Sequence, residues 1–188
     1  VVAARARAEE LGYGLEVFSI GDTNPAAFLR MLRARGIRGL LFAPMELGHR
    51  LGEWNLEDFC GVTVGFRLGN PALHFVMKDF FAGAWSLLCR LRVDGFCRPA
   101  LALDSAHSAL TQFRIVGSYE AFLLENVAVR DRIAPWRNAN SRAGFEDWLG
   151  KNQPDVLVVD HEGFFSAGRK VPKNLPVYAL ESAGTLPG

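Results

Sequence analysis

The sequence lacks the features that mark several common classes of protein. It has only three cysteines, Cys60, Cys89 and Cys97, an odd number without the C-x-x-C spacing of a zinc site or redox pair. No apolar run approaches the roughly 18 residues of a membrane span. Basic residues exceed acidic ones by only one, 21 against 20. We therefore expect buried thiols in a reducing compartment, the cytoplasm, with no membrane contact and no broad basic face for DNA.

Motifs of catalysis and cofactor binding are also missing. The chain has no G-x-G-x-x-G or G-x-x-x-x-G-K-[ST] fingerprint for a nucleotide, and no G-x-S-x-G elbow for a nucleophilic serine. The histidines are scattered, with no pair at metal-ligand spacing in the sequence: His49, His74, His107 and His161. These absences favour a protein that binds rather than catalyses, without a metal or a cofactor.

The sequence does contain a regular alternation of helix and strand patterns. Asn24-Pro25 is typical of a helix start, and Asp94-Gly95 is typical of a turn that closes a helix. The nearly unbroken apolar run 37–43 is typical of a strand covered on both faces in a parallel sheet. The other expected strands are 15–20, 62–66, 75–77, 100–103, 155–159 and 177–180, and apolar stripes at helical spacing lie between them.

This alternation predicts an α/β protein with doubly wound parallel sheets. A second cycle begins near Gly95 to Arg98, so we expect two lobes, residues 1–96 and 97–188. The chain starts inside a helical pattern, so we expect the core to be truncated, with the opening strand of the first lobe missing.

Several segments also occur in a characteristic order. An aspartate, Asp79, stands at an expected strand end before the helix that Gly95 closes, and later segments are Arg114-Ile115-Val116-Gly117 with Ala121, Pro154 to Asp160, and Val171-Pro172. In this order and spacing the chain resembles the LacI-type (LacI/GalR) transcriptional regulators, whose ligand-binding core is related to periplasmic sugar-binding proteins. It departs from the family's pattern at Gly95-Phe96, where Gly-His is usual.

The resemblance implies the effector-sensing core of a cytoplasmic regulator that binds a small molecule, a sugar by preference, between two lobes of periplasmic-binding-protein type. Such a core forms a homodimer, contacts DNA only through a headpiece outside this sequence, and changes operator affinity when the effector binds. A periplasmic sugar-binding protein of a transport system is the alternative. An enzyme on the same fold is a third possibility, which would need a nucleophile or a metal-ligand cluster at the strand ends.

Polar side chains just past strand ends are the site candidates, because parallel sheets bind ligands at that edge. Asp79 and Asp160 could accept hydrogen bonds from sugar hydroxyls, and Arg114 could grip a hydroxyl pair or a carboxylate. His161 follows Asp160, and Trp136 could stack on a sugar ring. Simpler alternatives stay open: a helix cap for Asp79, a turn for Asp160, an exposed helix face for Arg114 and the core for Trp136.

Overall fold

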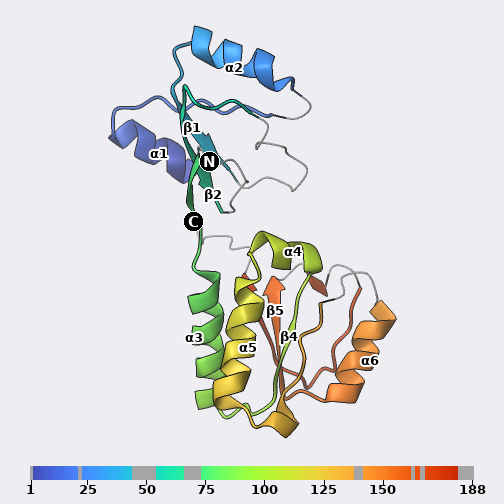
Figure 1. Ribbon diagram of the computed structural model, residues 1–188. Helices are drawn as coiled ribbons and strands as arrows, with labels where there is room; N and C mark the ends of the chain where they lie inside the picture. Colours follow the sequence, from blue (N-terminus) through green and yellow to red (C-terminus); the bar gives the residue numbers. More distant parts are fainter. Residues whose placement is uncertain are drawn as a thin grey trace. The chain divides into compact units, whose positions relative to one another are not determined.

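The computed structural model divides into two compact units, Val1–Lys78 and Asp79–Gly188. It describes residues 2–20, 23–43, 54–65, 73–137, 142–161, 164–165 and 168–181 (Figure 1). The units divide before the helix α3 (Phe80–Val93), whereas the sequence placed this helix in the first lobe, 1–96. The reason is that α3 packs against α5 (Arg114–Asn126) of the second unit.

The first unit contains a parallel sheet in the order β1-β2-β3. Its elements are α1 (Val2–Glu10), α2 (Pro25–Ala34), β1 (Gly39–Phe42), β2 (Cys60–Val64) and β3 (Leu73–Val76). The side chain of Asn24 accepts a hydrogen bond from the backbone N–H of Ala27 at 3.1 Å, so the predicted start of α2 is confirmed. The core of this unit consists of Leu29, Leu32, Phe42, Trp54, Leu56 and Phe59.

The predicted strand 15–20 is wrong. The structure assigns no strand to residues 15–20, and residues 14–20 line a cavity of about 1100 Å³ together with residues of β1 and β2. The run 37–43 does form a strand, but Leu41 is 52% exposed, so β1 is not covered on both faces as expected.

The second unit contains another parallel sheet, in the order β4-β5-β6. Its strands are β4 (Pro99–Ala102), β5 (Val156–His161) and β6 (Val177–Glu181). Its helices, besides α3 and α5, are α4 (Ser105–Leu110), α6 (Arg142–Asn152) and the short 3-10 helix Val129–Asp131. In Figure 1, α3 and α5 lie on one side of β4 and β5, and α6 lies on the other.

The central strand of this sheet is buried on both faces. Leu157 and Val159 of β5 pack in one cluster with Phe145 and Leu149 of α6. Because side chains alternate along a strand, Val158 points to the opposite face, where it is 1% exposed. The predicted α/β fold with parallel sheets is confirmed, and in the second unit helices cover both faces.

The cysteines differ from the prediction of buried thiols. Cys60, the first residue of β2, and Cys97, in the loop before β4, are exposed, while Cys89 is half-buried, and all three are free. One exposed thiol therefore lies at the start of a strand and the other in a loop, and neither lies in the core.

None of the helices that the structure describes is long and apolar enough to cross a membrane.

Candidate functional site

Ionisable side chains gather at the carboxyl edge of the sheet in the second unit. β5 ends at Asp160 and His161, β6 ends at Glu181, and Asp104 follows β4. Helix α4 begins directly after Asp104, at the end of the sheet toward which β5 points (Figure 1), and it carries His107. Because the strands are parallel, residues far apart in the sequence meet at this edge.

Asp160 is the centre of this group. It is fully buried, and both of its carboxylate oxygens accept hydrogen bonds. Oδ2 accepts from the backbone N–H of Asp104 at 3.0 Å and lies 3.1 Å from Nδ1 of His107, while Oδ1 accepts from the N–H of His161 at 2.9 Å. One carboxylate therefore ties together the ends of β4, β5 and helix α4, and this compensates the cost of burying its charge.

Two imidazole rings flank this carboxylate. The ring centroids of His107 and His161 lie 5.4 Å apart, and Nε2 of His161 is 3.8 Å from Oδ1 of Asp160. The hydrogen bond that His107 makes to the Asp160 carboxylate raises the pKa of His107; burial opposes this shift, and the charges of Asp160, Glu181 and Asp104 reinforce it. The site therefore favours a positive charge next to Asp160.

Asp79 lies at the start of α3, near this edge. Its Oδ1 accepts a hydrogen bond from the N–H of Ala82 at 3.0 Å, so the predicted helix cap exists. The ring of the next residue, Phe80, meets His107 edge-on with centroids 6.4 Å apart. The cap leaves Asp79 exposed, so it can also contact a ligand.

Arg114 is the first residue of α5, and it is exposed. The two residues before it, Gln112 and Phe113, have φ angles of 53° and 58°, in the left-handed region that non-glycine residues rarely adopt. The tight turn between α4 and α5 thus requires strained backbone, which clusters at functional sites in proteins. This turn sets the position of Arg114 at the start of α5.

Trp136 lies beside β4, where its backbone N–H donates to Leu101 and its carbonyl accepts from Leu103. Its ring packs against Phe145 and Trp148, with centroids 6.0 and 5.9 Å away. Its Nε1 is buried and has no hydrogen-bond partner among the described residues. These contacts are those of a core residue, and the stacking role stays a prediction.

The structure places His107, which its spacing in the sequence did not single out, beside Asp160 and His161, and the binding roles of these two residues stay predictions. His107 and Asp160 are 53 positions apart, so their spacing in the sequence carries no ligand pattern. The available signal was positional, since His107 follows an expected strand closely, as Asp160 does. Of the two remaining histidines, His74 lies on β3 of the first unit, and His49 is outside the described residues.

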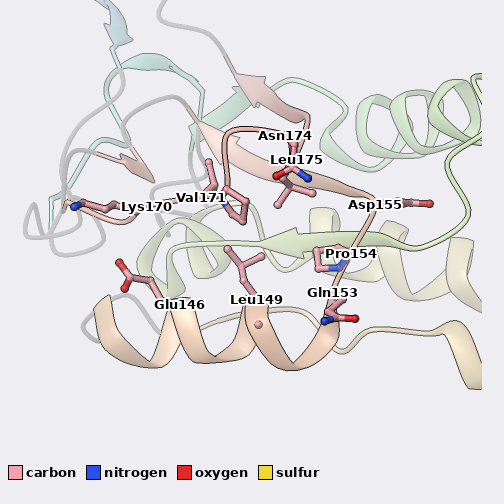
Figure 2. Close-up of a pocket in the computed structure, with 11 residues that line it drawn as sticks. Glu146, Leu149, Gln153, Pro154, Asp155, Lys170, Val171, Asn174 and Leu175 are labelled. Carbon is pink, nitrogen blue, oxygen red and sulfur yellow. The ribbon is translucent and has the colours of Figure 1, made fainter.

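A separate hollow of about 620 Å³ lies at the amino edge of the same sheet, beside α6. Figure 2 shows Glu146 and Leu149 on α6 and, across the hollow, Val171 and Leu175 of the segment before β6. Asp155, at the start of β5, accepts hydrogen bonds from the N–H groups of Cys97 and Arg98. None of the predicted site residues lines this hollow.

These features define a class: α/β proteins of the periplasmic-binding-protein type, with parallel sheets, here with polar side chains at the carboxyl edge of the second one. More particularly, the chain has the fold of LacI-family transcription regulators. It is similar to the transcription regulator CcpA of Lactococcus lactis, with a TM-score of 0.61 and 19% identity, over 95% of this chain and 72% of that one.

Two further structures support this fold. A sugar-binding transcriptional regulator of the LacI family from Escherichia coli, complexed with phosphate, has a TM-score of 0.57 and 17% identity, over 95% of this chain and 70% of that one. A LacI transcriptional regulator from Lactobacillus brevis has a TM-score of 0.60 and 14% identity, over 93% of this chain and 71% of that one. No family model and no curated protein matches the sequence.

Proposed function

We propose that this chain is the effector-sensing core of a LacI-type transcriptional regulator, and that it binds a small molecule, a sugar by preference, without catalysing a reaction. The observation that carries the proposal is the carboxyl edge of the second sheet, where α3, α4 and α5 all begin and polar side chains converge on a fold shared with LacI-family regulators. The similar structures reported above are regulators, which favours sensing over transport.

In this proposal the exposed side chains contact the effector and the buried carboxylate positions them. Arg114 and Asp79 offer donors and acceptors that a sugar's hydroxyls match. His161, whose side chain is 38% exposed, is held by Asp160, which is itself inaccessible. Asp160 would thus act through its neighbours, and Trp136 would form part of the wall.

The effector would act by favouring one conformation of a homodimer in the cytoplasm, and so change the operator affinity of a headpiece outside this sequence. A ligand that binds the folded protein only, at 100 times its dissociation constant, stabilises it by about 2.7 kcal/mol. We therefore expect a measurable rise in melting temperature with one class among monosaccharides, disaccharides, sugar phosphates and purines.

Variants of the 188-residue chain test which residues carry the binding. Arg114→Ala should abolish the rise, and so should Asp79→Asn, which keeps a capping oxygen but removes the charge. Arg130→Ala is the matched control, because Arg130 is an exposed arginine of the 3-10 helix after α5. A folded protein that no panel compound stabilises, or a rise that both site variants retain, would contradict the proposal.

A further inference from the structure

We propose that His107, Asp160 and His161 form a binding site for a divalent transition-metal ion of the Zn²⁺ type. One ligand atom from each of these residues lies within 4.8 Å of the other two. Imidazole nitrogen and carboxylate oxygen are the donors that Zn²⁺ and its neighbours in the series accept together. The site shares Asp160 and His161 with the proposed effector site, but it binds a different class of ligand and needs neither Arg114 nor Asp79.

The distances fit the coordination geometry. Two ligand atoms of a tetrahedral ion, each about 2.0 Å from the metal, lie roughly 3.3 Å apart. Nδ1 of His107 is 3.1 Å from Oδ2 of Asp160, and Nε2 of His161 is 3.8 Å from Oδ1 of the same carboxylate, so these two separations lie on either side of this value. A metal ion would lie between Nδ1 of His107 and the carboxylate of Asp160, in place of their direct contact.

The surroundings supply the charge and the rigidity that such a site needs. Asp160 is fully buried and held by the N–H groups of Asp104 and His161, which fixes the orientation of the carboxylate as outer partners fix metal ligands. Glu181 pairs with His161 in the β5–β6 ladder and, with Asp104, acts electrostatically on His107. Three carboxylates around two imidazoles suit a dication.

Access is also provided. The side chain of His161 is 38% exposed, whereas that of His107 is 11% exposed and that of Asp160 is 1% exposed. An ion can therefore enter from the His161 side, and three protein ligands leave a fourth position for water, as in open zinc sites. The simpler alternative is a buried His–Asp hydrogen bond with no ion, and the following experiment separates the two.

The test titrates the chelator-treated 188-residue chain with ZnCl₂ by calorimetry, and with CoCl₂ by the visible absorption of tetrahedral Co²⁺. Cys60→Ser and Cys97→Ser are introduced first, since these exposed thiols also bind zinc. We expect one ion per chain, with imidazole–carboxylate ligation in the cobalt spectrum. No effector is present, so this result and the effector screen can each fail independently.

His161→Gln and His107→Gln should each lower zinc affinity by more than about 10-fold, the minimum loss expected when a partner of a metal site is removed. His74→Gln, an exposed histidine on β3, should leave affinity unchanged. Because His161 is part-exposed, its variant should keep the fold, which circular dichroism checks. The proposal would be overturned if the folded parent bound no stoichiometric zinc. It would also be overturned if both site variants bound zinc as tightly as the parent does.

Discussion

Asp160 decides the local structure of the carboxyl edge more than any exposed residue beside it. A carboxylate with no solvent contact must have its oxygens hydrogen-bonded, and here the partners come from the loop after β4, from β5 and from α4. The sequence placed Asp160 at this edge but as a direct ligand contact. The structure gives both of its oxygens protein partners, and the direct contact with an effector stays a prediction.

Tyr119 has a comparable role in the core of the second unit. It is fully buried, and its hydroxyl lies 2.9 Å from the carbonyl of Pro99 and 2.7 Å from that of Ile133, sharing one proton between them. Tyr119→Phe removes this donor and leaves buried carbonyls without it, so we expect a loss of about 1–3 kcal/mol in the free energy of unfolding. Urea denaturation followed by circular dichroism measures it.

The stabilisation by the Tyr119 hydroxyl should also depend on pH. Burial raises the pKa of Tyr119 above its ordinary value of 10.0, and the charge of Glu120 adds to the shift. The unfolded chain then loses this proton first, so the stabilisation is complete below pH 10.0 and declines as the pH rises above it. The difference in the free energy of unfolding between wild type and Tyr119→Phe should therefore decrease between about pH 9 and about pH 11, which is about one unit on either side of the ordinary tyrosine pKa.

Tyr178→Phe is the matched control for both measurements. Tyr178 lies on β6 and is 40% exposed, so removing its hydroxyl leaves no buried carbonyl unpaired. We expect its stability to stay within about 0.5 kcal/mol of wild type at neutral pH. A loss equal to that of Tyr119→Phe would show that the buried hydroxyl has no special role.

At the scale of elements, sequence patterns predicted those whose signals are local. The Asn24-Pro25 start of α2 and the Asp94-Gly95 end of α3 depend on caps and on the φ of 99° at Gly95, which a glycine adopts without strain. Residues 15–20 have a strand's composition, but a strand also needs a neighbour, and here a cavity lies beside them. Pairing is a property of the whole sheet, so composition could not predict it.

Residue spacing could not predict the meeting of His107 with His161, for the same reason. Nothing local relates two histidines whose shared partner, Asp160, is 53 positions from the first. What brings them together is the parallel pairing of β4 with β5, which puts the residues after both strands at one edge. A pattern search by spacing finds sites within one element, and it misses sites that a sheet assembles.

Helix α1 provides the element-scale prediction. It has nine residues and none of them is buried, although the sequence suggested an apolar stripe at helical spacing. An isolated helix shorter than about 12 residues is marginal in water, because few hydrogen bonds offset the cost of nucleation. We expect its amides to exchange with deuterium far faster than those of α3 and α5, whose inner faces are buried.

Hydrogen–deuterium exchange with mass spectrometry measures this directly. Helix α2 is the internal control, since it has a similar length of ten residues but buries Leu29 and Leu32. Its amides should be protected relative to those of α1. Equal protection in the two helices would contradict the view that burial, rather than helix propensity, stabilises these elements.

For the whole molecule, the fold is retained despite little shared sequence. A TM-score of 0.61 accompanies an identity of 19% with CcpA of Lactococcus lactis. The sequence order of strand ends and helix starts carried the resemblance, and these are positions where backbone geometry limits the choice of residue. Among the described residues the two units differ in packing, because both faces of β5 in the second unit are buried, whereas Leu41 of β1 in the first unit is 52% exposed.

This difference in packing between the two units predicts that they unfold separately. Among the described residues, six buried apolar side chains belong to the first unit and 22 to the second. The hydrophobic cluster that includes Leu29 and Phe59 lies within the first unit, and the cluster that includes Ala100 and Phe164 lies within the second. Apolar burial is the main stabilising contribution, so the first unit should open at a lower urea concentration. Native-state hydrogen exchange should show α2 and β1 exposed while β4 and β5 stay protected.

Two core substitutions make the prediction specific. Leu32 and Leu157 are both fully buried, one in each unit, and replacing either with alanine costs about 2–5 kcal/mol. Leu32→Ala should speed exchange in α2 and β1 alone, and Leu157→Ala should speed it in β4, β5 and α6. If either substitution speeds exchange equally in both units, the chain unfolds as a single cooperative body, because a local loss of packing then reaches every amide.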